Sequence, residues 1–264
     1  MYRFVLTRQW VTLTLFALVL IPVMIKLGFW QYHRHEHRVA QNELIATNLT
    51  AKPVPVTELT SPGHLVPRSD YWRAVTATGT YDTAHEVVVR MRTSNNDKVG
   101  FHVVTPLVLA DGRVLLVNRG WVAGGDDPRA YPPVPAAPSG EVTVTGRLKA
   151  DETSRGSGIK DRKGLPDRQV MLINSEQQAA SLGRPVLGGY LELVSPAPAD
   201  GTPEPVAEPD HDSIGAHMAY AVQWWLFAAS VPVGWLVLVR REKRDRQAAA
   251  AAADAPGREP APTV

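Results

Sequence analysis

The sequence predicts an α+β membrane protein in which two transmembrane helices flank a mostly antiparallel β domain outside the cytoplasm. Two apolar runs, residues 10–30 and 217–239, lie near opposite ends of the chain. Each is long enough to cross a hydrocarbon layer of about 30 Å as a helix. Between them, residues 56–195 contain short runs rich in Val and Thr, several of which alternate apolar and polar side chains as β-strands do.

The first apolar run has the features of an uncleaved signal anchor. Trp10 and Trp30 bracket it, and indole rings favour the membrane interface. Its only formal charge, Lys26, lies near one end, where a long side chain can extend to the headgroups. No small-x-small cleavage site follows the run, as a cleaved signal peptide would require. Too few residues precede it for a mitochondrial transit peptide, so we expect a bacterial plasma membrane.

Basic residues after the second apolar run predict its orientation. The run is uncharged from Ala219 to Val239. A cluster of Lys and Arg follows directly, and such clusters stay in the cytoplasm. It consists of Arg240, Arg241, Lys243, Arg244 and Arg246. With two spans, residues 1–9 and 240–264 are then both cytoplasmic, and the domain between the spans is extracytoplasmic.

Polar segments connect these parts. Residues 31–55 have the pattern of a helical extension of the first span followed by a linker. Residues 196–216 are rich in Pro, Asp and Glu, which predicts a flexible linker back to the membrane. The tail, residues 240–264, is first basic and then rich in Ala and Pro. We expect it to be disordered after Gln247, because it offers no large side chain to bury.

The β domain is expected to be a small sheet with one or two helices. Asp111 and Gly112 lie between two β-like runs and predict a hairpin turn. Residues 118–121 (NRGW) follow a strand and are expected to turn, whereas residues 124–140 form a long loop. A short helix is expected over residues 174–182. The expected strands are residues 71–81, 87–91, 101–109, 114–117, 142–148 and 190–194.

The composition excludes several functions. The chain has no cysteine, so disulfides, zinc–thiolate sites, iron–sulfur clusters and thiol catalysis are impossible. A net charge of +2 gives no general field that would favour nucleic acid. Residues 156–158 (GSG) lack the strand–elbow–helix setting of a serine hydrolase and are expected to be a loop. Without a Walker loop, dinucleotide fingerprint or paired carboxylates, we do not expect an enzyme.

His217 is the most informative of the histidines. It stands at the head of the second apolar run, and on a helix it shares one face with Tyr220, Ala221 and Trp224. An imidazole above a small residue and between aromatic rings is suited to ligate a haem iron. The other interpretation is a polar cap at an aromatic membrane interface. The residues alone favour the cap and leave both interpretations open.

Basic side chains just after the first span suggest two further interpretations. His33 and His37 lie one helical turn apart, a spacing that can chelate a divalent metal. No third ligand has a suitable spacing, so solvated side chains are favoured there. Arg34 and Arg38 share a helical face with Gln31. Their guanidinium groups can pair with lipid phosphates or with haem propionates, and lipid anchoring is somewhat favoured on composition alone.

Charged residues of the β domain are expected to be structural. For Arg119 we favour stacking on an aromatic ring or pairing with a carboxylate inside the domain. Asp126 and Asp127 can bind a cation in principle, but we expect them only to shape their loop.

Three widely spaced motifs make the chain similar to a known family. The first, LGFWQ, closes the first span and is followed by Arg34 and Arg38. The second comprises VGFHVVTPL and VNRGWV, within residues 99–122. The third is His217 with YAVQW at the head of the second span. On these motifs the chain resembles the surfeit-locus (Surf) family of cytochrome c oxidase assembly proteins, over roughly residues 10–240.

The resemblance implies a role in the maturation of a haem–copper oxidase, in which haem a is placed in the catalytic subunit. The partners it implies are that subunit, haem a synthase and membrane lipid, with no nucleic acid. The family's candidate haem-ligating histidine matches His217, which would bind the haem iron. The residues expected around the haem are Trp30, Arg34, Arg38, Tyr220 and Trp224. A cofactor-free scaffold that stabilises an oxidase subunit during assembly remains the alternative.

Overall fold

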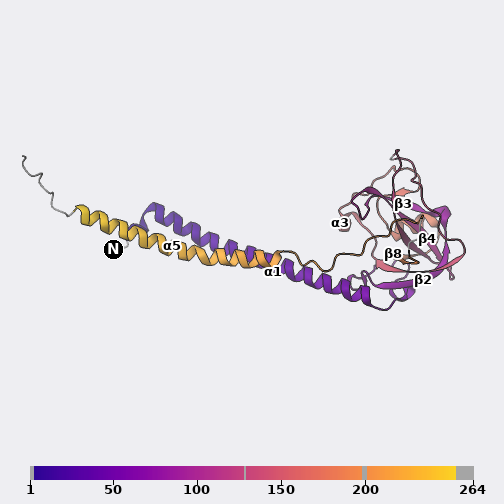
Figure 1. The fold of residues 1–264 in the computed structure, drawn as a ribbon, viewed down its shortest axis with the longest axis horizontal. Coiled ribbons are helices and arrows are strands. Elements are labelled where there is room, and N and C mark those ends of the chain that lie inside the picture. The colour runs from indigo at the N-terminus through magenta and orange to yellow at the C-terminus, as the bar shows by residue number, and fades with distance from the viewer. Residues whose placement is uncertain (1–2, 128, 198–200, 254–264) are drawn as a thin grey trace, which may run out of the picture. The chain divides into compact units, whose positions relative to one another are not determined.

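The computed structural model describes residues 3–127, 129–197 and 201–253 of the chain. The chain divides into two compact units (Figure 1). A helical unit contains residues 1–40 and 213–264, and a β unit contains residues 41–212. The predicted α+β class, with a long apolar helix near each end of the chain, is confirmed.

Two long helices make up most of the helical unit. After a 3-10 turn at Arg3–Leu6, α1 spans Arg8–Thr50 and α5 spans His217–Ala253. Both are long and apolar enough to cross a membrane, by length and composition. α1 continues well past its apolar part, as predicted. α5 continues through residues 248–253, so the prediction of disorder directly after Gln247 is wrong. These residues are alanines, which have the highest helix propensity. The rest of the predicted disordered tail lies outside the described residues.

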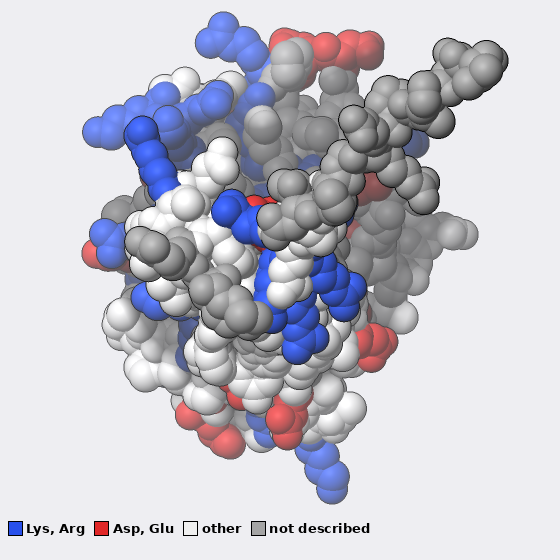
Figure 2. Space-filling view, turned by 90° about the vertical axis from the view of Figure 1, so that its left-hand side faces the viewer, with Lys and Arg blue, Asp and Glu red and all other residues white. Residues whose placement is uncertain are grey.

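Lys and Arg side chains gather where α5 leaves its apolar part. Figure 2 shows them around the near end of the helical unit. Some of them also hold the local structure: Arg246 Nε donates to Glu242 Oε1 at 2.8 Å, and its guanidinium lies 5.1 Å from the centroid of the Phe4 ring. The basic cluster is therefore carried on a regular helix that also contacts the N-terminal turn.

α1 and α5 pack antiparallel along a common seam. Their register is fixed by contacts of Thr14 with Trp235 (3.1 Å), of Gly28 with Trp225, and of Gln31 with His217 (3.0 Å). A side chain at Gly28 would overlap the indole of Trp225, so only glycine fits there. On α1 the partly or fully buried residues repeat every three or four positions, as in a coiled coil. They include Thr14, Ala17, Ile21, Met24, Gly28, Gln31, His35 and Arg38.

The β unit is built from strands joined by short helices and turns. The short helices are α2 (Val56–Leu59), α3 (Ser154–Ser157) and α4 (Ser175–Leu182), and 3-10 turns span Arg68–Asp70 and Thr83–His85. The strands are β1 (Val54–Pro55), β2 (Ala74–Tyr81), β3 (Val87–Thr93), β4 (Val99–Leu109), β5 (Val114–Ala123), β6 (Glu141–Lys149), β7 (Gln169–Val170) and β8 (Val186–Ser195). The predicted strands and the predicted short helix are thus confirmed, with shifted boundaries.

The strands close into a barrel. Their order is β1-β2-β6-β8-β5-β4-β3-β7, and β2 also pairs with β4. The ring β2-β6-β8-β5-β4 is therefore closed, which leaves these strands without a free edge (Figure 1). The pairs β1–β2, β3–β7 and β5–β8 are parallel and the others antiparallel, which confirms a mostly antiparallel domain. Fully buried side chains that fill the interior include Val75, Leu107, Leu115, Leu148 and Leu191.

Two predicted irregular segments have different outcomes. The hairpin turn between β4 and β5 is confirmed, because Gly112 N donates to the Leu109 carbonyl at 2.9 Å. The loop expected at residues 156–158 is wrong in part, because α3 forms one helical turn there. The Thr153 side chain caps this turn by accepting from Gly156 N at 3.1 Å.

The turn expected at residues 118–121 is wrong, because β5 continues through this stretch. Val103 pairs with Gly120 and Val104 pairs with Asn118, so Arg119 is the extra residue of a β-bulge. A bulge re-aims a side chain without ending the strand. The turn-like composition of NRGW therefore reflects a bulge in a continuous strand.

The linker of residues 196–216 is not flexible throughout, so this prediction is wrong for its middle part. Glu204 and Trp121 form an antiparallel bridge, with N–O distances of 2.6 and 2.8 Å. Arg147 donates to the Val206 carbonyl at 2.7 Å. A segment without helix or strand is thus fixed on the barrel by its backbone groups.

Candidate functional site

His217 is the first residue of α5, and its ring is held by α1. His217 Nδ1 lies 3.0 Å from Gln31 Oε1. Because an amide oxygen only accepts hydrogen bonds, Nδ1 carries a proton in this contact, which in the neutral imidazole is the ring's single N–H. The lone pair is then on Nε2, the nitrogen that can bind a metal.

A glycine leaves space beside this nitrogen. Gly215 precedes α5 with a φ of +66°, a conformation that glycine adopts readily. A Cβ at this position would lie 3.4 Å from His217 Cδ2 and 3.5 Å from Nε2. A side chain at Gly215 would therefore be in van der Waals contact with the Nε2 edge of the imidazole, and glycine leaves that space open.

The predicted cationic residues lie on α1 around Gln31. The Arg34 guanidinium lies over the Trp30 ring, 5.0 Å from its centroid. Arg38 Nε donates to the Ser213 carbonyl at 2.9 Å, just before α5 begins. Both guanidinium groups are thus oriented by neighbours in the helical unit, and Arg34 is exposed.

On α5, Trp225 packs against Gly28 in the seam, and Trp224 contacts Phe227. Trp225 lies against Gly28, and its ring centroid is 5.5 Å from that of Phe29 and 6.2 Å from that of Tyr32. The Trp224 ring makes an edge contact with Phe227, 6.1 Å away, on its own helix. The sequence did not distinguish the two indoles, because both lie three or four positions from the buried Ala221 and Ala228.

Helix geometry assigns these aromatic side chains to two flanks of the seam. Successive residues of an α-helix are turned by about 100°, so Tyr32 and Trp30 point to opposite sides of Gln31. On α5, Trp225 and Tyr220 likewise point to opposite sides of His217. Because Trp225 meets Tyr32 on one flank, Trp30 and Tyr220 border the other flank.

We call the flank bordered by Trp30 and Tyr220 the open flank. By the spacing of residues along the two helices, it also includes Arg34 and Trp224. About half of the Trp30 and Tyr220 side chains is exposed, 52% and 49%. Since the helices are antiparallel, Arg34 lies beyond the Gln31–His217 pair in one direction and Tyr220 lies beyond it in the other. At a rise of about 1.5 Å per residue each offset is about 5 Å. The open flank thus carries a guanidinium, an imidazole and aromatic rings in sequence.

The other histidines after the first apolar run do not gather into a metal site. Within the described residues, no group of three or more potential ligands is placed to hold a metal ion. His33 and His37 are exposed, and their solvated state stays a prediction. His35 instead occupies the seam, and its Nδ1 is buried without a hydrogen-bond partner in the described part of the chain. The three-and-four spacing of the seam could have separated His35 from its neighbours.

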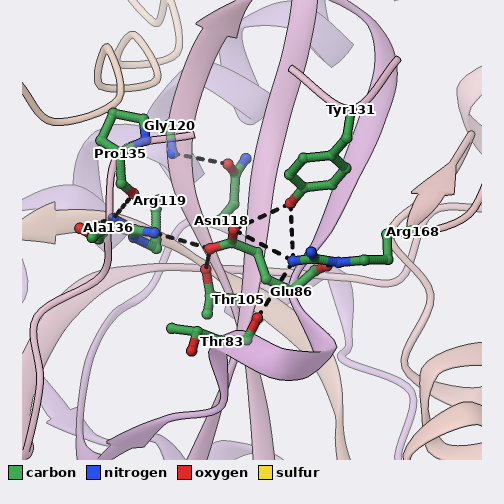
Figure 3. Close-up of polar contacts among 10 residues, drawn as sticks. All are labelled: Thr83, Glu86, Thr105, Asn118, Arg119, Gly120, Tyr131, Pro135, Ala136 and Arg168. Atoms are coloured by element: carbon green, nitrogen blue, oxygen red, sulfur yellow. Dashed lines mark hydrogen bonds and ion pairs between the residues drawn. The ribbon is translucent and has the colours of Figure 1, made fainter. Parts of the chain in front are cut away.

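The predicted structural role of Arg119 is confirmed by a buried network around Glu86 (Figure 3). Arg119 Nη1 lies 3.0 Å from Glu86 Oε2, and the two side chains are only 4% and 8% exposed. Thr105 Oγ1 donates to the same carboxylate at 2.7 Å and Tyr131 OH at 3.1 Å. Arg119 also donates to the carbonyl groups of the loop at residues 135–136, at 3.0 Å each. The network ties the long loop to the barrel.

The other residues of the central motif are likewise engaged inside the barrel. Asn118 Nδ2 lies 3.1 Å from His102 Nδ1, and Asn118 Oδ1 accepts from Gly120 N at 3.1 Å. Burial, together with the nearby Arg92, lowers the pKa of His102 to about 4. His102 is therefore a neutral structural histidine at physiological pH. These contacts show that the motif helps to build the β unit.

These features define a class of proteins in which a β-barrel lies, in sequence, between two long apolar helices. Residues 18–229 match the SURF1 family, and the chain belongs to that family. It is 31% identical over 250 residues to uncharacterised SURF1-like proteins of Mycobacterium bovis and Mycobacterium tuberculosis, which covers 92% of this chain and 88% of theirs. A SURF1-like protein of Rickettsia felis is 28% identical over 108 residues, 40% of this chain and 45% of the relative. The resemblance carried by the three motifs is thereby confirmed.

Proposed function

We propose that this protein is a membrane-anchored assembly factor for a haem–copper oxidase, and that it holds haem a at His217 before the haem passes to the catalytic subunit. Membership of the SURF1 family, which is associated with oxidase assembly, supports the first part. The hydrogen bond between His217 Nδ1 and Gln31 Oε1 carries the second part, because it leaves Nε2 as a free donor.

The residues present fit a haem. His217 Nε2 would be the axial donor, and Gly215 leaves room beside it. When bound, haem a supplies an iron that accepts an imidazole nitrogen. The guanidinium groups of Arg34 and Arg38 suit the propionates, since charge-assisted pairing of guanidinium with carboxylate is strong and directional.

The aromatic side chains suit the apolar part of the ligand. Tyr220 and Trp224 lie on the membrane side of His217 along α5, and Trp30 borders the same flank. Their rings offer apolar faces to a macrocycle while the guanidinium groups remain at the polar end. The open flank therefore offers charged groups at one end and apolar rings at the other, as an amphiphilic ligand requires. If His217 were only a polar cap of the helix, this arrangement would not be needed.

The chain's own contribution is binding and release rather than turnover. His217 would hold the iron, the arginines would orient the propionates, and the aromatic rings would exclude water from one face. A carrier of this kind needs only moderate affinity, because the haem must pass on to a tighter site. Haem a synthase would supply the ligand and the oxidase catalytic subunit would accept it.

The proposed location is a bacterial plasma membrane, with two spans, both termini in the cytoplasm and the β unit outside. The basic cluster at the end of the α5 span supports this orientation, because such clusters are retained in the cytoplasm. Alkaline phosphatase fused within an exposed loop of the β unit should be active, and the same reporter fused after Ala253 should be inactive. The opposite pattern would refute the orientation.

Anaerobic purification of the full chain, with and without co-expressed haem a synthase, tests the haem assignment. The wild-type protein and the exposed-histidine control His33→Ala should carry a Soret band that depends on the synthase. His217→Ala should lose it while remaining folded. A wild-type protein that supports oxidase assembly but never acquires haem would instead favour the cofactor-free scaffold.

A further inference from the structure

We infer that Gln31 is a positioning residue that tunes His217 for reversible haem binding. Its neutral amide fixes the tautomer in which Nε2 can bind iron. It does not make the imidazole a stronger electron donor, as a carboxylate would. This inference rests on the proposed function and assigns a role to a residue that makes no contact with haem itself.

Gln31 is placed to do this by the helix seam. It lies one turn beyond Gly28, where α1 and α5 approach so closely that a side chain would overlap Trp225. Its side chain is partly buried, and its Oε1 faces the first residue of α5 at 3.0 Å. The amide is therefore held by α1 while the imidazole is held by α5, so the hydrogen bond fixes the ring orientation across the seam.

The hydrogen bond selects one tautomer. Gln31 Oε1 accepts the proton on His217 Nδ1, so the lone pair stays on Nε2. Without this acceptor the ring can place its proton on Nε2, which abolishes the donor beside Gly215, or it can rotate. Hydrogen-bond partners of metal-bound histidines typically contribute 10- to 100-fold in ligand affinity.

The choice of an amide rather than a carboxylate has a further consequence. A carboxylate draws the Nδ1 proton towards itself and makes the imidazole a stronger donor, which favours tight binding of ferric iron. Gln31 orients the ring equally well but carries no charge. Glu36, the carboxylate nearest to Gln31 along α1, is engaged with Tyr32 on another face of the helix. His217 therefore keeps the weaker donor strength that suits a haem destined for transfer.

The test uses the full chain in detergent, titrated with haem a, and compares Gln31→Met with Gln31→Glu. Gln41, an exposed glutamine on the same helix, provides the matched control Gln41→Met. Gln31→Met should raise the Kd for haem a by 10- to 100-fold and lower the iron–imidazole stretching frequency in resonance Raman spectra of the ferrous form. Gln31→Glu should raise that frequency, lower the reduction potential and slow transfer of haem to apomyoglobin. Gln41→Met should match the wild type.

The outcomes separate the two proposals. If His217→Ala loses haem a while both Gln31 variants keep the wild-type Kd, stretching frequency and transfer rate, the role of Gln31 is refuted and the proposed function stands. If His217→Ala binds haem a as the wild type does, the proposed function fails and this inference fails with it. Because Gln31→Glu retains an acceptor, its opposite spectral shift distinguishes tuning from a loss of folding.

Discussion

The barrel and the end of the helix pair that carries His217 use the same residue types in different ways. In the barrel, Arg119 is buried and its guanidinium is engaged by Glu86 and by backbone carbonyls, and the partly buried His102 lies against Asn118. At the end of the helix pair, Arg34 is exposed, and His217 bonds to Gln31 through Nδ1. A buried side chain whose bonding capacity is used up stabilises the fold. A side chain that is oriented but not saturated can take a ligand.

The largest expected effect is on the barrel. Arg119→Met should destabilise the β unit by about 3–5 kcal/mol, because it leaves the Glu86 carboxylate buried without its closest cation. Hydrogen exchange of barrel peptides in the full chain measures this. Arg113→Met, which breaks an exposed pair with Asp111, should leave exchange nearly unchanged. The amount of haem a bound per folded molecule should not fall in either variant. A loss of haem binding in Arg119→Met alone would contradict the assignment of a purely structural role to the barrel network.

The second effect is a loss of stability in acid. The pKa of His102 is near 4 in the folded protein and near 6.5 when unfolded, so the unfolded chain binds more protons between these values. The contribution of neutral His102 to the free energy of unfolding is on the order of 3 kcal/mol. It is fully present above pH 6.5 and is lost as the pH falls to 4. Urea unfolding at several pH values should show this slope. His102→Gln should flatten it, whereas the exposed-histidine control His64→Gln should keep it.

The third effect concerns the seam between the helices. Gly28→Ala should destabilise the packing of α1 on α5 by about 1–3 kcal/mol, because the methyl group overlaps the Trp225 indole and forces a shift. Thermal unfolding followed by tryptophan fluorescence measures it. Gly234→Ala provides the matched control on α5, where nothing lies within 4 Å of the added methyl group. There the substitution should be neutral or stabilising, since alanine favours helix.

The sequence predicts the architecture well because its signals are periodic. Long apolar runs give the two helices, and alternation gives the strands. Prediction from the sequence fails where two segments that are distant in the chain meet. Residues 118–121 have the composition of a turn, yet Asn118 and Gly120 serve a bulge whose partner is β4. The Pro-rich stretch around Glu204 has the composition of a free linker, yet its backbone pairs with Trp121.

The candidate site is predictable only in part for the same reason. The position of His217 before an aromatic run is compatible with a haem ligand as well as with a polar cap, and the resemblance to a family is what favours the ligand. Nothing in its neighbourhood identifies Gln31 as its partner, because the two residues are far apart in the chain and meet only through the register of the seam. The role of Gly215 is equally hidden, since it depends on which edge of the imidazole faces the glycine.

The smallest expected effect gives the sharpest comparison of the two regions. Gly215→Ala adds a methyl group about 3.5 Å from His217 Nε2, where an iron would have to approach, at a backbone position with φ of +66°. Gly63→Ala adds a methyl group at a similar φ of +72° in the β unit, with nothing within 4 Å. Both variants incur a similar backbone strain of about 1 kcal/mol. Only Gly215→Ala should also weaken haem a binding, by about tenfold, or 1.4 kcal/mol, in a spectroscopic titration. Equal haem affinities in the two variants would mean that the Nε2 edge of His217 is not where the ligand binds.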